Sequence, residues 1–166
     1  MSGQQRVAAF ARRAVHQLPS PVQSGLRQLR RRLARVPPQP MAMPLLSVVV
    51  VATDAESYLN ECLHSLRSQT IKRFEVLVVD NGSADATAAI AEQAADKDPR
   101  FKVIRSPRLG VAASRNAGAR QARGTFLAFV DATDTVPQSA YRTMINMLRQ
   151  TGSDFAAGSV RTVVRG

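Results

Sequence analysis

Hydrophobic residues change their spacing near Leu45, and this change predicts where a folded domain begins. Residues 46–51 form a mostly β-branched run without polar alternation, which is typical of a strand covered on both faces. Helical spacing follows over residues 57–69, and strands and helices then alternate. Further strands are predicted over residues 74–79, 101–105 and 126–130 and, from a weaker pattern, from Asp154, with helices over residues 84–95, 111–122 and 139–150.

This alternation predicts the fold class. Strands separated by helices of this length are joined by right-handed crossovers and form a mostly parallel sheet. We therefore expect a Rossmann-like α/β fold, a mostly parallel sheet flanked by helices, that is incomplete at the C-terminus. In such sheets ligands bind at the carboxyl ends of the strands.

A basic amphipathic helix is predicted ahead of this domain, over residues 20–36. Ser20 stands at its N-cap and Pro37 stops it. Arginines surround one stripe of apolar residues at helical spacing, formed by Leu26, Leu29, Leu33 and Val36. Such a helix suits an anionic membrane surface, although a solvated arm, or a helix docked on another part of a longer protein, explains the pattern equally well. We expect residues 1–43 to form this arm with a Pro-rich linker and residues 44–166 to form the α/β domain.

The net charge of +11 is concentrated in the arm. Eight arginines and no acidic residue precede Asp54, which gives +8, and fifteen basic against twelve acidic residues in the remainder give +3. This asymmetry indicates an appended segment with its own partner and not a uniformly basic nucleic-acid-binding domain. We expect no nucleic-acid partner. No apolar run reaches the roughly 18 residues that span a bilayer.

The single cysteine, Cys62, lies at an apolar position of a predicted helix. We expect it to be a core residue without a catalytic role.

Acidic residues gather just past the predicted strand ends, in ATDAE (52–56), DNGSAD (80–85) and DATD (131–134). Parallel strands bring these segments to one edge of the sheet, where like charges repel unless a cation or hydroxyl donors complement them. The alternative is that Asp80, Asp85 and Asp134 are turn or capping residues. Gly82 is expected to permit a tight turn, and Ser83 to cap the next helix.

From Ser47 to about Pro137 the chain resembles the nucleotide-sugar-binding half of inverting family 2 glycosyltransferases, which have the GT-A fold. SVVVVATDAESYLNECLHSLRSQT resembles the opening strand and helix of that family, FEVLVVDNGSADAT its acidic VDDGS turn, and GVAASRNAGARQARGTFLAFVDATD its Arg-Asn-x-Gly and DxD segments. The resemblance implies sugar transfer from a nucleoside-diphosphate sugar. It implies nucleotide-sugar binding by Thr53, Asp54, Asp80, Arg115 and Asp131, and a Mg or Mn site at Asp131, Thr133 and Asp134. Gly118, in the Arg-Asn-x-Gly segment, is expected to let its helix pack closely on the sheet.

The chain departs from the family pattern at three places. Val51–Asp54 replaces the usual Pro-x-Tyr-Asn loop, Asn81 replaces the second acid of the VDDGS turn, and Thr133 replaces the second acid of the DxD motif. A neutral hydroxyl binds a hard cation less strongly than a carboxylate, although Asp134 could substitute if the chain turns tightly after Asp131. A weakened metal site and no metal site remain open, and Arg115 is expected to face either a phosphate or neighbouring loop carbonyls.

Inverting transfer also needs a general base that takes the proton of the acceptor hydroxyl. In the family this base and the acceptor pocket follow the DxD strand, so we expect the base beyond Gly166 and regard the chain as the donor-binding part of a longer protein. Asp154 is no convincing base, and His16 and His64 are expected at the surface.

Two other function classes are considered. One is a non-catalytic nucleotide- or partner-binding module derived from a truncated transferase. The other is a dinucleotide-binding enzyme. Such enzymes carry the motif G-x-G-x-x-G after the first strand, and the sequence ATDAE stands there instead. The basic arm suggests a cytoplasmic protein, peripheral at the inner face of the membrane, that acts in the synthesis of cell-envelope polysaccharide or glycoconjugates.

Overall fold

The computed structural model describes residues 43–159 and residue 162. The predicted arm over residues 1–43 and its helix over residues 20–36 therefore lie outside the described residues, except for Met43, and stay predictions. In the part of the chain that the structure describes, no helix is long and apolar enough to cross a membrane.

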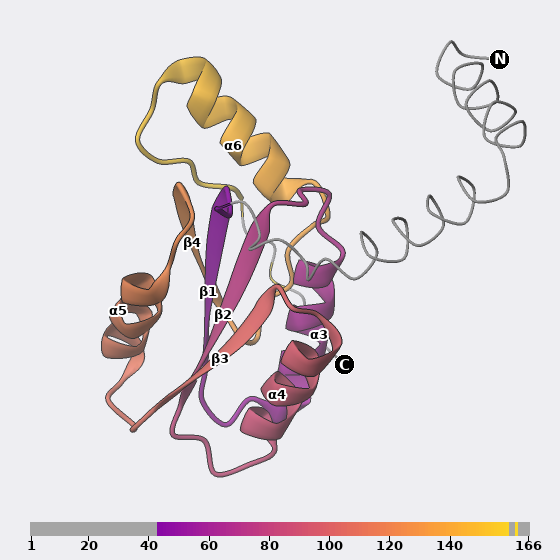
Figure 1. The fold of residues 1–166 in the computed structure, drawn as a ribbon, viewed down its shortest axis with the longest axis vertical. Helices are drawn as coiled ribbons and strands as arrows, with labels where there is room; N and C mark the ends of the chain where they lie inside the picture. Colours follow the sequence, from indigo (N-terminus) through magenta and orange to yellow (C-terminus); the bar gives the residue numbers. More distant parts are fainter. Residues whose placement is uncertain (1–42, 160–161, 163–166) are drawn as a thin grey trace, which may run out of the picture. The chain divides into compact units, whose positions relative to one another are not determined.

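A four-stranded parallel sheet carries the fold (Figure 1). Its strands are β1 (Leu46–Ala52), β2 (Phe74–Asn81), β3 (Phe101–Ser106) and β4 (Phe126–Asp131), in the order β3-β2-β1-β4. The helices are α3 (Glu56–Arg67), α4 (Thr87–Lys97), α5 (Val111–Gln121) and α6 (Ala140–Thr151). The predicted parallel α/β fold is confirmed. The strand order changes direction at β1, because β2 and β3 lie to one side of it and β4 to the other.

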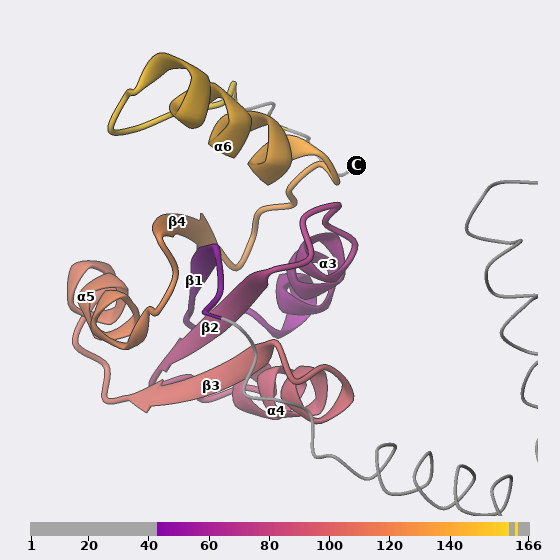
Figure 2. The same ribbon diagram turned by 45° about the horizontal axis from the view of Figure 1, so that its top comes forward.

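Both faces of β1 and β2 are covered, which explains why their sequences show no polar alternation. Successive side chains of a strand point to opposite faces. Val48 and Val50 belong to a core cluster that includes Leu59 and Leu63 of α3. Val49 belongs to a second cluster on the other face, the face covered by α5. Figures 1 and 2 show α3 and α4 on one side of the sheet and α5 on the other.

Gly118 lets α5 approach the sheet closely. A Cβ atom at this position would lie 2.4 Å from Val49 Cγ1 and 3.1 Å from Val79 Cγ2. Both valines are fully buried, and β-branched side chains have little freedom to move aside. The predicted close packing of this glycine is therefore confirmed.

A buried carboxylate fastens the edge of the sheet where the strands begin. Glu75 Oε1 accepts hydrogen bonds from Ser47 Oγ at 2.8 Å and from the backbone N–H of Arg123 at 2.9 Å. Glu75 Oε2 pairs with the Arg123 guanidinium at 3.0 Å and with Lys102 Nζ at 3.2 Å. Burial by itself raises the pKa of Glu75, but these hydrogen bonds outweigh it and hold the pKa below its ordinary value. The ionised side chain thus joins the first three strands and the turn before β4.

The chain beyond β4 returns along α3 to the edge where the strands begin. Gln69 Nε2 donates to the carbonyl oxygens of Val136 at 3.1 Å and Pro137 at 2.9 Å. Helix α6 then packs Tyr141 and Ile145 into the core. These contacts place α6 at the edge where the strands begin, as Figure 1 shows.

The strand predicted from Asp154 is wrong. Residues 153–159 form no strand in the described structure. Gly152 ends α6 in a left-handed conformation with φ of 68°. Phe155 is 83% exposed, so this segment lacks the packing and strand pairing that would stabilise an extended conformation.

Strand β4 forms one edge of the described sheet and shows apolar side chains to solvent. Among the described strands it pairs with β1. Leu127 is 45% and Phe129 46% exposed. Both lie on the α5 side of the sheet, because Phe129 is in register with Val49.

Substituting Gly118 by valine should destabilise the fold. The new side chain has to displace Val49 within a packed core, and such overpacking costs about 1–3 kcal/mol. We expect the free energy of unfolding, measured by urea titration, to fall by about 2–3 kcal/mol. Gly158→Val is the matched control, since an added Cβ at that position meets nothing within 4 Å. Equal stability of the two variants would contradict the close packing of α5.

Candidate functional site

Asp80 and Asp131 lie at the same edge of the sheet, on either side of β1. Asp80 is in register with Ala52, and Asp131 with Val51. The expectation that carboxylates from separate crossovers share one edge is confirmed. The strand order also changes direction here, between β1 and β4, and open α/β sheets bind ligands at such a point.

Asp54 ties the β1–α3 loop to its neighbours. Its backbone adopts a left-handed φ of 46°. The N–H of Asp54 donates to Ser83 Oγ at 3.1 Å, and Asp54 Oδ1 accepts from the N–H of Ala84 at 2.8 Å. Its second oxygen pairs with the Arg108 guanidinium. The carboxylate therefore holds three loops together, and its predicted contact with a nucleotide stays a prediction.

The starts of α3 and α4 cap each other. Asp85 Oδ2 accepts from the N–H of Glu56 at 3.0 Å, and Glu56 Oε2 accepts from the N–H of Ala86 at 3.0 Å. Asp85 Oδ1 also accepts from the N–H of Thr87 at 2.9 Å. Hydrogen bonds from Thr87 and Glu56 lower the pKa of Asp85. The prediction that Ser83 caps the helix is wrong: its hydroxyl accepts from the β1–α3 loop, and Asp85 has the capping role.

Asn81 links two loops across the end of β2. Its side chain is buried, with Nδ2 donating to Thr53 Oγ1 at 3.0 Å and Oδ1 accepting from the N–H of Leu109 at 3.0 Å. An amide can donate and accept at once, so Asn81 satisfies both neighbours. Thr53, a predicted binding residue, is held by this bond.

Asp80 stabilises the turn after β2, which is the alternative role considered for it in the sequence analysis. Its side chain is buried, and Oδ1 accepts from the N–H of Ser83 at 3.1 Å. Gly82 permits this turn with φ of 68°, and a Cβ there would lie 3.0 Å from the backbone nitrogen of Arg108. The tight turn at Gly82 is confirmed, whereas a nucleotide contact of Asp80 stays a prediction.

The segment after β4 turns tightly, as a role for Asp134 in metal binding would require. The N–H of Asp134 donates to the carbonyl oxygen of Asp131 at 2.9 Å. Asp131, Thr133 and Asp134 are all exposed on this turn. Burial first, and then the charges of Asp134 and Asp131, raise the pKa of the Cys62 thiol to about 12. Both carboxylates belong to this one turn, and Cys62 is a buried core residue.

These side chains fit a hard cation only in part. Carboxylate and hydroxyl oxygens are the donors that Mg²⁺ prefers. In residues 43–159, however, no group of three or more His, Cys, Asp and Glu side chains is arranged to hold a metal ion. Asp131, Asp134 and Thr133 would hold Mg or Mn if a bound diphosphate supplied further oxygens.

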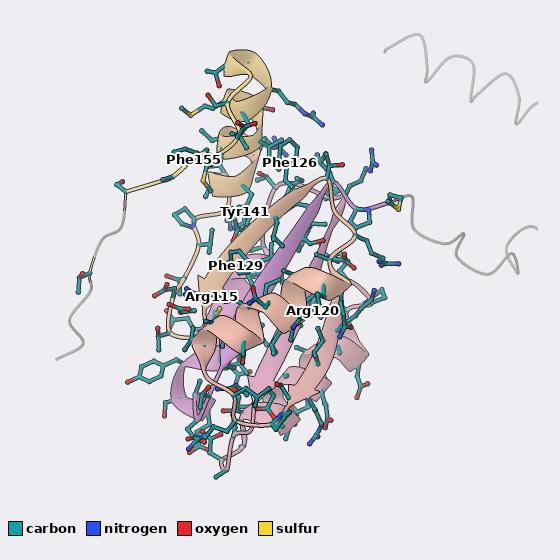
Figure 3. The ribbon with its side chains drawn as sticks, turned by 90° about the vertical axis from the view of Figure 1, so that its left-hand side faces the viewer. Arg115, Arg120, Phe126, Phe129, Tyr141 and Phe155 are labelled. Atoms are coloured by element: carbon teal, nitrogen blue, oxygen red, sulfur yellow. The ribbon has the colours of Figure 1, made fainter. Side chains whose placement is uncertain are left out.

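Arg115 of α5 contacts Asp131, a partner that the sequence analysis missed. One guanidinium nitrogen lies 2.8 Å from Asp131 Oδ1, and the guanidinium carbon lies 6.0 Å from the centroid of the Phe129 ring (Figure 3). Its Nε is buried and has no hydrogen-bond partner among the described residues. Loop carbonyls, one of its two expected environments, are not among the contacts of Arg115 within the described residues. The other expectation, that Arg115 faces a phosphate, stays a prediction.

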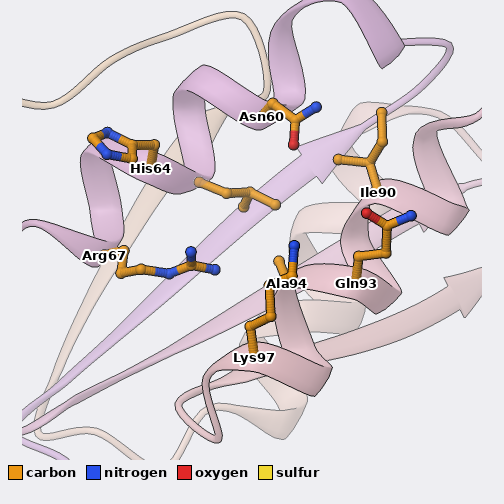
Figure 4. Close-up of a pocket in the computed structure, with 8 residues that line it drawn as sticks. Asn60, His64, Arg67, Ile90, Gln93, Ala94 and Lys97 are labelled. Atoms are coloured by element: carbon orange, nitrogen blue, oxygen red, sulfur yellow. The ribbon is translucent and has the colours of Figure 1, made fainter.

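A cavity of about 260 Å³ lies between α3 and α4, away from the carboxylates (Figure 4). The lining residues are distributed along both helices. They are Asn60, Leu63, His64, Arg67, Ile90, Gln93, Ala94 and Lys97. The basic ones lie in the last helical turns, where cations complement the helix dipole. His64 is exposed there, as predicted.

The chain belongs to Glycosyl transferase family 2, whose family model matches residues 47–165. The Bacillus subtilis proteins EpsH and EpsJ, both named as glycosyltransferases, are similar to it. EpsH is 45% identical over 96 residues, which is 58% of this chain and 28% of EpsH. EpsJ is 34% identical over 112 residues, which is 68% of this chain and 33% of EpsJ. The chain thus spans about a third of the length of each relative.

Solved structures show the same GT-A-like fold. The crystal structure of S. aureus TarS in complex with UDP-GlcNAc is 30% identical, with a TM-score of 0.62 over 72% of this chain and 37% of that one. The mannosyltransferase PcManGT from Pyrobaculum calidifontis, in complex with GDP-Man and Mn²⁺, is 24% identical with a TM-score of 0.60, over 71% of this chain and 37% of that one. At 24% identity, the similarity to PcManGT shows only that the two chains share a fold.

Replacing Asn81 by alanine should loosen the loop before α5. The N–H of Leu109 loses its acceptor, and a hydrogen bond of this kind contributes about 1 kcal/mol. We expect the Leu109 amide to exchange roughly five to ten times faster in a hydrogen-exchange NMR measurement. Asn81→Asp keeps an acceptor for Leu109 and should stay protected, and the exposed Asn60→Ala is the control. Unchanged exchange in Asn81→Ala would show that Asn81 does not hold this loop.

Proposed function

We propose that this chain is the donor-binding part of an inverting glycosyltransferase that uses a nucleoside-diphosphate sugar. The observation that carries the proposal is the convergence of Asp80 and Asp131 on one edge of the sheet, in a member of this family. The complex of TarS with UDP-GlcNAc, at 30% identity, supports a donor of this class.

Each side chain at the edge has a role in this proposal. Thr53, Asp54 and Asp80 face the nucleoside from the ends of β1 and β2. Asp131 and Asp134, with Thr133, hold Mg or Mn, which when bound would offset the negative charge that develops on the leaving diphosphate. Arg115 lies beside Asp131, within reach of the same phosphates.

Transfer also requires an acceptor hydroxyl that attacks the anomeric carbon from the face opposite the leaving group, while a base takes its proton. Helix α6 lies at the other edge of the sheet, away from these carboxylates. We therefore assign the base and the acceptor pocket to the part of the relatives that this chain does not match.

A second candidate is a non-catalytic module that binds a nucleotide or a protein partner. Two points favour it: the resemblance implies that Thr133 replaces an acid of the DxD motif, and Arg115 already pairs with Asp131. The two candidates differ in their dependence on a metal ion.

Binding of UDP or GDP should depend on Mn²⁺ if the transferase proposal holds. We expect isothermal titration of the 166-residue chain to show binding with Mn²⁺ and at least tenfold weaker binding in Asp131→Ala, which loses a charged ligand. Asp96→Ala, which removes an exposed carboxylate from α4, should bind like the unaltered chain. Metal-independent binding would favour the module, and a preference for NAD would overturn both candidates.

We further propose that residues 20–36 bring the protein to an anionic membrane at the cytoplasmic face, where an acceptor of the cell envelope would be available. The support is the stripe of leucines set among arginines, since basic residues near an anionic surface each contribute about 1 kcal/mol.

Flotation with liposomes tests this arm. The whole chain should float with vesicles that contain anionic lipid, and a chain that starts at Met43 should remain in the lower fractions. Neutral phosphatidylcholine vesicles are the control and should retain little of either form. If both forms behave alike with anionic vesicles, the arm does not bind the membrane.

A further inference from the structure

Arg115 and Asp131 form an ion pair that a ligand can reach. The guanidinium nitrogen and the carboxylate oxygen are 2.8 Å apart, and the two side chains are 41% and 52% exposed. Arg115 comes from α5 and Asp131 from the end of β4, so the pair bridges two elements at the point where the strand order changes direction. Exposed pairs contribute little to stability, typically about 0–1 kcal/mol. This pair is therefore easily exchanged for other partners.

A divalent cation alone binds poorly beside this pair. To reach Asp131 Oδ1 it must displace the guanidinium, and it then lies next to an unpaired positive charge. The Arg115 guanidinium carbon lies 6.0 Å from the centroid of the Phe129 ring, and its Nε is buried. The guanidinium can therefore turn but stays near the cation.

A diphosphate alone meets the opposite obstacle. If it takes the Arg115 guanidinium, it leaves the Asp131 carboxylate unpaired beside its own negative charges. Asp134 lies one turn further along the same segment and adds another negative charge. Repulsion between these groups opposes the binding of the anion when no cation is present.

We propose that Arg115 and Asp131 exchange partners when a metal ion and a nucleoside diphosphate bind together, and that this exchange makes the two ligands bind cooperatively. The metal ion takes Asp131, and the diphosphate takes the released Arg115. Every charge then has an opposite neighbour, which neither ligand achieves alone. The inference rests on the proposed function and adds to it a positioning role for Arg115. Coupling between two ligands is reciprocal and is commonly about 5- to 150-fold.

The test is a complete binding cycle on the 166-residue chain. Affinities for Mn²⁺ are measured by electron paramagnetic resonance with and without UDP, and affinities for UDP by isothermal titration with and without Mn²⁺, with GDP in parallel. The free-solution affinity of Mn²⁺ for the nucleotide is measured separately and subtracted. For the unaltered chain we expect each ligand to strengthen the binding of the other at least tenfold.

The Arg115→Gln variant should distinguish the exchange of partners from a general effect of removing one positive charge. Without the competing guanidinium, Mn²⁺ alone should bind several-fold more tightly, whereas UDP in the presence of Mn²⁺ should bind more weakly. The coupling factor should then fall to near one. Arg115→Lys keeps the charge and should retain part of the coupling. Arg120→Gln removes a positive charge further along the same helix (Figure 3) and should leave all affinities unchanged.

The outcomes distinguish the two proposals. A coupling factor in Arg115→Gln equal to that of the unaltered chain overturns the exchange and leaves the proposed function intact. If neither probe binds the unaltered chain in any combination, the proposed function fails, and the exchange fails with it. Thermal unfolding of each variant, followed by circular dichroism, shows whether the variants are folded at the temperature of the titrations.

Discussion

Burial of the central strands on both faces is the constraint on which the rest of the structure depends. A strand covered by helices on each side has few interior positions for a polar side chain unless hydrogen bonds compensate it. The polar residues of β1 and β2 therefore gather at their two ends. Ser47 and Glu75 satisfy each other at the edge where the strands begin, and Asp80 and Asn81 follow at the opposite edge. The edge where the strands begin is held by hydrogen bonds of Glu75, and the edge where they end carries the candidate site.

Side chains hold the loops at that site with little help from regular secondary structure. Asp54, Asn81 and Asp85 each bond to the backbone of a different loop. The site is thus prearranged by bonds that cross from one connection to the next, and it does not depend on the stiffness of any single loop. A binding site held in this way loses less entropy when a ligand arrives.

The sequence allowed the fold and the location of the site to be predicted, but few of the contacts within it. Continuous apolar runs identified β1 and β2, and parallel pairing then required Asp80 and Asp131 to share an edge. The bond between Arg115 and Asp131 could not be foreseen, because it depends on how far α5 is rotated over the sheet. A capping role for Asp85 was considered, but its bond to the start of α3 was not foreseen, since sequence patterns treat the two helices separately. The strand expected from Asp154 failed because a short apolar pattern carries no information about a partner strand.

The exposed edge of β4 has a practical consequence for work with the isolated chain. Leu127 and Phe129 accompany a row of backbone groups that no described strand covers on that side. An edge of this kind is a template for pairing with another polypeptide. We therefore expect preparations of these 166 residues to self-associate as their concentration rises, so dilute samples are preferable for measuring how one molecule behaves.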